Sequence, residues 1–425
     1  MRLKLLLVCL LTVPGGQFLS AAEWRTLPET EAAQSVDLVF DRAGNPRLAY
    51  RAGLVNGVLR EARWTGSKWQ MTTVDATPDT GEYASIVVDD SNNSRIAYFD
   101  WTQTGLRMAV EESGNWNLQD VAIWNYNGEY AHQLQDSSGK SHLFWFDRYN
   151  EMLAYAKKSN LSWQNEPVDF SRVNGIYIAA VETPDGKPTV LYSAPSAGEI
   201  RLAKPGTGDW VIETIAESGR FIQLGIDSAG TLKAAWISSE TGRVRIAQKT
   251  HAGWEIEDLP QSPAVSGSLA MLVRPDGFRV LIVQDLETAA FHVFREESAG
   301  WISETLFQGD PQPRHFPAIE LAPNGEEAMA IITHQGLRYF GNLGAGGFWE
   351  EAKEISDGWK AHPTIGIIHA EPENRTYSER LGWQFLFPFE EGTWFYDPNG
   401  TWWWTRSDIF PHIYSMEIEG WKQFD

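Results

Sequence analysis

The sequence contains almost no cysteine: Cys9 is the single one among its 425 residues. Cys9 falls within a segment that we expect to be removed on export, so the mature chain has none. This absence excludes disulfide bonds and a thiolate nucleophile. The remaining chain of roughly 400 residues must be held together by its hydrophobic core, and it is long enough to bury one.

Long apolar runs are also missing, apart from a short one near the N-terminus. Arg2 and Lys4 precede apolar residues 5–13, and small residues follow at 20–22. This order predicts a secretory signal over residues 1–22. The run is too short to cross a bilayer, and no later stretch approaches about 20 apolar residues. We therefore expect a secreted protein (extracellular, periplasmic or at the cell surface) without a membrane span.

Positive charge is scarce as well. The chain has 35 Lys and Arg against 56 Asp and Glu, a formal net charge of −21. Loss of Arg2 and Lys4 with the signal makes the mature charge −23. Such a charge opposes non-specific binding to nucleic acid, anionic lipid or polyanionic glycans. We expect no nucleic-acid partner, and solubility explains the charge most simply.

Helical periodicity and metal-ligand spacing are absent too. No segment keeps a 3.6-residue apolar period for three turns, which predicts almost no helix. The nine histidines are scattered, without a His-x-x-x-His pair or a His/Asp cluster at ligand spacing. We therefore expect neither a metal nor another cofactor.

What the sequence does contain is tryptophan at nearly constant intervals. Eight of its 20 tryptophans lie 44 to 48 residues apart. They are Trp24, Trp69, Trp116, Trp163, Trp210, Trp254, Trp301 and Trp349. A period of this length indicates repeated supersecondary units rather than one irregular domain.

Each repeat contains four short β-like segments. In the second unit they are residues 83–88, 94–99, 105–110 and 116–121, all bounded by turn formers. The third segment carries a recurring Leu-x-x-Ala pattern, as in Leu59/Ala62, Leu106/Ala109, Leu153/Ala156, Ile200/Ala203 and Val244/Ala247.

A turn with Asp and Gly three residues apart follows the first segment of several units, as in Asp41/Gly44 and Asp227/Gly230. Asp bonds back to the turn backbone and Gly accepts a positive φ, so the motif predicts a tight hairpin. Calcium binding is a weaker alternative, because no turn gathers enough acidic ligands.

Four antiparallel strands repeated seven times predict an all-β, seven-bladed β-propeller over residues 23–370. We expect the in-phase tryptophans to pack between blades. Seven units are complete between Ser35 and Ile355, but residues 24–27 look like a spare fourth strand and residues 364–368 like a spare first strand. The alternative is an eight-bladed ring closed by the N-terminal strand.

The C-terminal residues 371–425 break the period. Short aromatic segments recur there at about ten-residue spacing between Gly, Asp and Asn turns, which predicts a small aromatic-rich β appendage. So dense a set of aromatics must pack in part against the propeller or a partner, or remain exposed.

Both parts resemble known proteins. The repeat is an apolar strand, an Asp-x-x-Gly turn, a strand ending in Tyr or Trp, a Leu-x-x-Ala strand and a Gly-x-Trp strand. Over residues 24–369 it resembles a repeat of many secreted bacterial proteins, which implies a sialidase-like or lectin-like propeller in the broad sense. The sialidase Asp-box, Ser-x-Asp-x-Gly-x-x-Trp, and the Phe/Tyr-Arg-Ile-Pro motif are absent.

The tail resembles a Trp-rich C-terminal module of secreted proteins from Verrucomicrobia and related bacteria. The residues that match are Leu381-Gly382-Trp383, Trp394-Phe395-Tyr396-Asp397, Trp402-Trp403-Trp404-Thr405, Phe410-Pro411-His412-Ile413-Tyr414 and Gly420-Trp421. The resemblance implies a bacterial exported protein with surface placement, and it names no ligand.

In a propeller, the loops before each first strand and after each second strand open on one face, around the central channel. Ligand sites prefer such concavities. These positions predict a ring of ligand-binding residues: Glu82, Tyr83, Glu129, Tyr130, Tyr177, Arg220, Arg314, His315, His362, Asp100 and Asp147.

Two enzymatic functions fit parts of this ring. Paired acids, Glu82 with Glu129 or Asp100 with Asp147, could serve glycoside hydrolysis, which needs two carboxylates at a defined separation. A polysaccharide lyase could instead use the residues Arg314, His315, His362 and Tyr130 to neutralise a uronate and move its proton.

Non-catalytic binding requires less of the ring. Aromatic rings beside acids and arginines suit a glycan or a protein ligand, by stacking on its apolar face and bonding its polar edge. A structural or adhesion role, with cell-surface association through the tail, requires only the repeat and the aromatic segments. We favour a secreted, non-catalytic recognition protein, because that interpretation demands the fewest special residues.

Overall fold

The computed structural model describes residues 24–27, 30, 33–66, 68–158, 162–171, 175–307, 317–333, 336–341, 353–356, 359–362, 366–370, 375–378, 382–389, 392–396, 401–405, 412–415 and 420–423. Every regular element in these ranges is a β-strand, which confirms the all-β prediction. Within the same ranges, no helix is long and apolar enough to cross a membrane.

Most strands belong to four-stranded antiparallel sheets. The first sheet contains β2 (Ala33–Phe40), β3 (Pro46–Ala52), β4 (Val58–Trp64) and β5 (Trp69–Asp75). The second sheet contains β6 (Thr80–Val88), β7 (Ser94–Asp100), β8 (Gly105–Glu112) and β9 (Asn115–Ala122). The third sheet contains β10 (Asn127–Gln135), β11 (Ser141–Asp147), β12 (Met152–Lys158) and β13 (Trp163–Asp169).

Four more sheets follow along the chain. The fourth contains β14 (Ile176–Glu182), β15 (Pro188–Ala194), β16 (Glu199–Pro205) and β17 (Trp210–Glu217). The fifth contains β18 (Gly219–Ile226), β19 (Leu232–Ser238), β20 (Val244–Thr250) and β21 (Gly253–Asp258). The sixth contains β22 (Val265–Val273), β23 (Arg279–Asp285), β24 (Phe291–Glu297) and β25 (Gly300–Phe307). The seventh contains β26 (Ala318–Leu321), β27 (Glu327–Thr333), β28 (Gly336–Phe340) and the N-terminal strand β1 (Trp24–Thr26).

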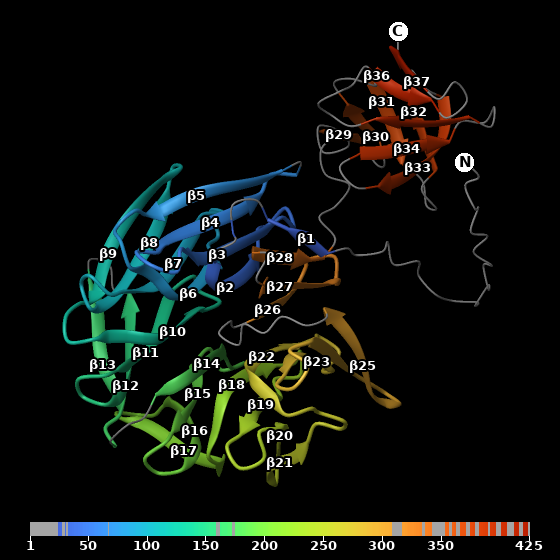
Figure 1. Ribbon diagram of the computed structural model, residues 1–425. Helices are drawn as coiled ribbons and strands as arrows, with labels where there is room; N and C mark the ends of the chain where they lie inside the picture. Colours follow the sequence, from blue (N-terminus) through green and yellow to red (C-terminus); the bar gives the residue numbers. More distant parts are fainter. Residues whose placement is uncertain are drawn as a thin grey trace.

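These sheets form a ring around a centre lined by their first strands. Each first strand contacts the next one, from β2 and β6 through to β22 and β26, and β26 contacts β2. Figure 1 shows the sheets following one another in chain order, from blue through green and yellow to orange. This is the arrangement of a β-propeller.

The hydrophobic core is divided among the junctions between neighbouring sheets. Seven clusters of buried side chains occur in the described residues, and each joins two consecutive sheets or the seventh and the first. The third-strand Leu-x-x-Ala residues lie in this core; Leu59 and Ala62 are both 0% exposed. Small alanines allow two sheets to approach face to face, since packed interiors leave little space.

The in-phase tryptophans pack at these junctions, as the repeat predicts. Trp69, Trp116, Trp163, Trp210, Trp254 and Trp301 each pack, partly buried, against the cluster between their own sheet and the preceding one. Trp210, for example, meets Phe144 and Tyr155 edge to face, with ring centroids 5.8 and 5.1 Å apart. Trp349 lies outside the described residues.

The turns after the first strands have the predicted chemistry. Asp41 Oδ1 accepts hydrogen bonds from the backbone N–H groups of Ala43 (3.0 Å) and Asn45 (2.9 Å), and Gly44 has a φ of 83°. Asp227 repeats the arrangement in the fifth sheet, with bonds of 3.0 and 2.8 Å. These carboxylates therefore cap their own turns.

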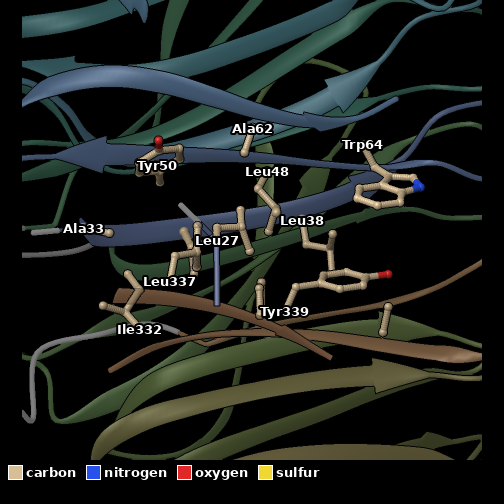
Figure 2. Close-up of a cluster of buried hydrophobic side chains, with 14 residues drawn as sticks. Leu27, Ala33, Leu38, Leu48, Tyr50, Ala62, Trp64, Ile332, Leu337 and Tyr339 are labelled. Carbon is tan, nitrogen blue, oxygen red and sulfur yellow. The ribbon is translucent and has the colours of Figure 1, made fainter. Parts of the chain in front are cut away.

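The N-terminal strand β1 comes first in the sequence but belongs to the seventh sheet. β1 is the fourth strand of the seventh sheet, with Trp24 opposite Phe340 and Thr26 opposite Arg338. It occupies the position that the period predicts for the segment starting at Trp349, and so does not belong to an additional sheet. Figure 2 shows Leu27 in one cluster with Leu48 of the first sheet and Leu337 of the seventh.

The remaining strands form one nine-stranded antiparallel sheet. Its strands are β29 (Lys353–Ser356), β30 (Trp359–His362), β31 (Gly366–Ala370), β32 (Arg375–Ser378), β33 (Gly382–Phe389), β34 (Gly392–Tyr396), β35 (Trp402–Thr405), β36 (His412–Ser415) and β37 (Gly420–Gln423). They pair in chain order. The aromatic tail segments are thus strands, as predicted.

This sheet extends further towards the N-terminus than the predicted boundary at residue 370. β31 pairs with β32 across that boundary, with Ile368 opposite Ser378 and Ala370 opposite Thr376. The expectation that residues 364–368 form a first strand of the propeller is therefore wrong for the described residues 366–368. Their backbone hydrogen bonds go to neighbours in the tail, which are closer in sequence than any partner in the ring.

Candidate functional site

Six consecutive first strands, from the first sheet to the sixth, contain a register shift near their start, and in four of them an aromatic residue at the shift has a left-handed backbone. The register shifts between Glu82 and Ser85 in the second sheet, and again at the equivalent places in the third, fourth and fifth sheets. The residues in these bulges with a left-handed backbone are Tyr83 (φ 53°), Tyr130 (56°), Tyr177 (54°) and Phe221 (54°). Side chains other than glycine rarely adopt this conformation, and bulges commonly redirect a side chain near a binding site.

The four rings lie in a curved row, which we call the aromatic arc; the outer pairs are tilted by 38 and 35°, and Tyr130 meets Tyr177 edge to face at 63°. Neighbouring ring centroids lie 4.8 Å apart for Tyr83 and Tyr130, 5.0 Å for Tyr130 and Tyr177, and 4.6 Å for Tyr177 and Phe221. Gly267 continues the series in the sixth sheet, where a β-carbon would lie 2.9 Å from the Phe221 ring. A glycine at this position therefore leaves room for the end of the arc.

The arc lines a cavity of about 120 Å³ at the centre of the ring. Its walls are Ser35, Val36, Tyr83, Ala84, Tyr130, Ala131, Tyr177, Ile178, Phe221, Ile222 and Gln223. Pockets that enclose a drug-sized ligand usually measure about 300–1,000 Å³. This cavity can receive one end of a ligand but cannot enclose a large one.

The tyrosines of the arc are held as neutral phenols. Burial raises the pKa of Tyr83 well above its usual value, and the neighbouring Tyr130 and Glu82 add to the rise. Burial also raises the pKa of Tyr130 to about 12 and that of Tyr177 above its usual range. At neutral pH these hydroxyl groups can donate and accept hydrogen bonds, but they are poor proton acceptors in a reaction.

The two predicted glutamates beside the arc accept hydrogen bonds from other side chains of the protein. Glu129 is 1% exposed and accepts two hydrogen bonds from Arg148, at 2.6 Å from Nε and 2.5 Å from Nη2. Glu82 accepts a hydrogen bond from the indole N–H of Trp101. Neither is an unpaired carboxylate facing its partner, as paired-acid glycoside hydrolysis would require.

The two predicted aspartates cap turns. Asp100 is 0% exposed, and its Oδ1 accepts from the N–H groups of Thr102 (2.8 Å) and Gln103 (3.0 Å). Asp147 is 4% exposed and accepts from both the backbone N–H (3.0 Å) and the side-chain amide (2.7 Å) of Asn150. Both carboxylates stabilise the turns that follow β7 and β11.

Of the basic and histidine candidates, the structure describes Arg220 and His362. Arg220 is exposed, at the start of β18, and its charge lowers the pKa of Tyr177 against the larger effect of burial. Arg314 and His315 lie outside the described residues. The prediction that His362 belongs to the ring is wrong, because its backbone pairs with Gly366 in the nine-stranded sheet.

Buried polar side chains occur on the first strands, where two of them join neighbouring strands, and sequence reasoning missed them. Asp37 Oδ2 accepts from the backbone N–H of Ile86 at 2.8 Å, and His132 Nε2 lies 3.2 Å from the carbonyl of Ala180. Burial raises the pKa of Asp37 to about 6 and lowers that of His132 to about 4. Burial likewise raises the pKa of Glu320 to about 7, with a contribution from Asp37. Acids within apolar strands were the signal that could have revealed them.

Exposed aromatic residues outside the arc were also missed as a set. Trp101, Trp124, Tyr126 and Tyr149 are 39, 59, 46 and 70% exposed, in the loops after β7, β9 and β11. Trp101 and Trp124 are out of phase with the tryptophan period, which is the signal that could have singled them out. In the described part of the chain, no group of three or more His, Cys, Asp and Glu side chains is placed to hold a metal ion.

Comparison with known proteins identifies the fold but no family. No protein-family model matches the chain, and no curated protein sequence matches it either. An ulvan lyase of polysaccharide lyase family 25 is similar in structure, with a TM-score of 0.52 and 11% identity over 74% of this chain and 95% of that one. The same enzyme with a bound glycan gives a TM-score of 0.51 at 11% identity. The SapL1 lectin, in complex with α-methyl fucoside, gives 0.46 at 12% identity over 67% of this chain and 98% of that one. At such identities the likeness to the ulvan lyase shows the fold alone, a β-propeller built of four-stranded antiparallel sheets.

Proposed function

We propose that this chain is a secreted, non-catalytic recognition protein that binds a glycan on the loop face of a seven-bladed β-propeller. The aromatic arc is the observation that carries the proposal. Four strained backbone positions hold four adjoining rings against one cavity, at a cost of about 1–3 kcal/mol for each strained residue. Strain of this kind persists where the surrounding structure supports it, and it clusters at ligand sites.

The chemistry of the arc suits a sugar better than a charged ligand. The parts of its rings that line the cavity offer apolar surface to the C–H groups of a pyranose, and its neutral phenols bond hydroxyl groups. The predicted acids Glu82, Glu129, Asp100 and Asp147 are engaged with protein groups. A binding role therefore uses the residues as they are, whereas hydrolysis would require freeing a pair of carboxylates.

Glycan-array binding followed by titration tests the proposal. We expect Tyr130→Gly to weaken binding by about 10–100-fold, because it removes one ring of the arc. Glycine keeps the positive φ without strain, so the fold should persist. Tyr130→Phe is the matched control: it retains the ring and should lose much less affinity. An array without binding, or equal affinity for Tyr130→Gly and the native protein, would refute the proposal.

The same samples distinguish binding from catalysis. Ulvan belongs in the panel, because a lyase of this fold was solved with a glycan of glucuronate and sulfated rhamnose. A lyase would create unsaturated chain ends, and a glycoside hydrolase new reducing ends. Either product, lost in His315→Ala or in Glu129→Gln, would establish an enzyme and overturn the non-catalytic role.

We also propose that residues 353–425 form a C-terminal module for surface association. Cross-strand pairing places Trp394, Trp404 and Tyr414 on one face of its sheet, together with Trp421. Trp421 is 54% exposed and packs edge to face on Trp404, with centroids 6.0 Å apart. Deletion of residues 353–425 should abolish cell association and leave glycan binding unchanged; retained association would exclude this role.

A further inference from the structure

Exposed aromatic side chains concentrate on one sector of the ring. The described residues of the seven sheets contain five of them, and all lie in loops of the second and third sheets: Trp101, Trp124, Tyr126, Tyr149 and Phe170. Single exposed aromatics are ordinary on a protein surface, but a contiguous group marks a binding surface. We call Trp101, Trp124, Tyr126 and Tyr149 the aromatic rim.

Backbone hydrogen bonds join the loops that carry the rim into one surface. Trp124 N–H donates to the carbonyl of Gln103 at 3.2 Å, which links the loop after β9 to the turn after β7. Arg148 N–H donates to the carbonyl of Tyr126 at 3.3 Å, which links the same loop to the turn after β11. The rim therefore crosses from the second sheet to the third without a break.

The rim also connects to the arc. Trp101 lies edge to face with Tyr126, with ring centroids 6.3 Å apart. The indole N–H of Trp101 donates to Glu82, the residue that immediately precedes Tyr83 of the arc. Trp101 thus connects the rim residue Tyr126 to the strand that carries Tyr83.

The central loop of the rim is held in a strained conformation. Trp124, Asn125 and Tyr126 have φ values of 74, 61 and 58°, three consecutive left-handed residues of which none is glycine. Asn127 supports the loop: its side-chain amide donates to the carbonyl of Trp124 at 3.0 Å, and its Oδ1 accepts from the indole N–H of Trp145 at 3.2 Å. Strain that the surroundings maintain in an exposed loop points to a function for the side chains it presents.

The charges near the rim are neutralised within the protein. Arg148 is 58% exposed, but it forms a two-pronged ion pair with Glu129, and Glu82 bonds Trp101. The net charge of the chain is −21. These features favour an uncharged ligand over a nucleic-acid strand or an anionic glycan, although stacked bases could use the same rings.

We infer that the aromatic arc, on the second to fifth sheets, and the aromatic rim, on the second and third, form one continuous track for an extended, uncharged polysaccharide chain. The inference rests on the proposed glycan-binding function and specifies its ligand. The cavity of about 120 Å³ takes one end of the chain, and successive sugar units stack on Trp101, Tyr126, Trp124 and Tyr149. A single terminal sugar would use the arc alone.

Chain length is the variable that tests the track. Disaccharides and hexasaccharides of β-1,4-glucan, β-1,4-mannan, β-1,4-xylan and β-1,3-glucan are titrated into the full-length protein. We expect the hexasaccharide of at least one series to bind about tenfold or more tightly than its disaccharide. Trp124→Gly, which keeps the positive φ, and Tyr149→Ala should each weaken hexasaccharide binding about tenfold and leave disaccharide binding unchanged.

Leu286→Ala is the matched control. Leu286 is 60% exposed in the turn after β23, which corresponds to the turn that carries Tyr149, but it lies in the sixth sheet. Leu286→Ala should change neither the hexasaccharide affinity nor the disaccharide affinity. If Trp124→Gly and Tyr149→Ala bind the hexasaccharide like the native protein while Tyr130→Gly loses binding, the track is refuted and the glycan site at the arc stands. Equal affinity of the native protein for disaccharide and hexasaccharide would also refute the track. If no uncharged series binds, or if a proline-rich peptide binds at the rim instead, the inference fails.

Discussion

At each position of the aromatic arc, an aromatic residue adopts a backbone conformation that favours glycine. Gly267 occupies the equivalent place in the sixth sheet, with a φ of 130°. There the Phe221 ring fills the space that a side chain of residue 267 would need. The end of the arc thus depends on the absence of one β-carbon.

Replacement of Gly267 by alanine should destabilise the protein more than its backbone conformation alone explains. A β-carbon would lie 2.9 Å from Phe221 Cζ, so the ring must move. We expect a loss of about 2–6 kcal/mol in the free energy of unfolding, from strain and overpacking together.

Gly253→Ala is the control, because Gly253 has a φ of 131° and an alanine β-carbon there would meet no atom within 4 Å. It should cost about 1–3 kcal/mol, the backbone share alone, and so less than Gly267→Ala by the overpacking share. Urea unfolding measures both variants. Equal losses would mean that Phe221 yields freely and that Gly267 does not limit the arc.

Burial of the Glu320 carboxyl group on β26 makes the stability of the protein depend on pH. Burial and the charge of Asp37 raise its pKa from 4.5 to about 7. The folded protein therefore holds this proton more tightly than the unfolded chain. The resulting stability is fully present below about pH 4.5 and is lost as the pH rises through 7.

Glu320→Gln should remove this loss. Above pH 7 the variant should be more stable than the native protein, by up to about 3 kcal/mol, and near pH 4 the two should be equal. The difference between their urea-unfolding curves isolates the effect from His132, whose lowered pKa acts in the opposite direction. Glu255→Gln, at an exposed position of β21, controls for the substitution itself. A difference that does not vary with pH would contradict the assignment.

Among the β-strands, the junctions between sheets carry a recurring polar motif. An aspartate that ends the fourth strand of one sheet accepts hydrogen bonds from a tyrosine and an arginine of the next sheet. Asp75 Oδ2 lies 2.7 Å from Tyr98 OH and 3.2 Å from Arg107 Nη1. Asp169 Oδ2 lies 2.7 Å from Tyr192 OH and 2.9 Å from Arg201 Nη1. The sequence separations agree, since each tyrosine follows its aspartate by 23 residues.

We expect these motifs to stabilise separate junctions independently. Tyr98→Phe and Tyr192→Phe should each cost about 1.5–3 kcal/mol, because each removes a buried hydrogen bond to a charged group. The double variant should lose the sum, since the two motifs share no partner. Denaturant titration of the three variants tests this. A double loss well beyond the sum would show that distant junctions are coupled through the ring.

For the whole molecule, the decisive contact joins residues far apart in the sequence. β1 pairs with β28, and Leu27, 2% exposed, lies in the cluster shared by the first and seventh sheets. Thr30 adds to the junction, because its Oγ1 accepts from the backbone N–H of Leu337 at 2.9 Å. These contacts connect the N-terminal segment to the last four-stranded sheet.

A chain that begins at residue 31 should be markedly less stable than one that begins at residue 23. It lacks β1 and the buried Leu27 side chain, and β28 loses its outer neighbour. Removal of a buried leucine alone costs about 2–5 kcal/mol, so we expect at least that loss. Thermal unfolding compares the two chains. Equal melting temperatures would mean that another segment can replace β1.

The local repeat pattern by itself was sufficient to predict the all-β class, most strands of the ring, the capped turns and the packing of six in-phase tryptophans. These features depend on neighbouring residues and on contacts that recur from unit to unit, so the residues of each repeat predict its strands and turns. The sequence also brought Tyr83, Tyr130 and Tyr177 to the centre of the ring, because they share one phase.

Only the tertiary structure decided which strand completes the seventh sheet and which candidate residues have free side chains. Trp24 and Phe340 pair across more than 300 residues, and no local pattern records such a partner. The sequence alone allows Glu129 to be a reactive acid, whereas the structure pairs its carboxylate with Arg148. The preference of a segment for a strand or a turn depends on nearby residues, so the sequence predicts it. The closure of the ring and the pairing of side chains depend instead on which distant groups the fold brings together.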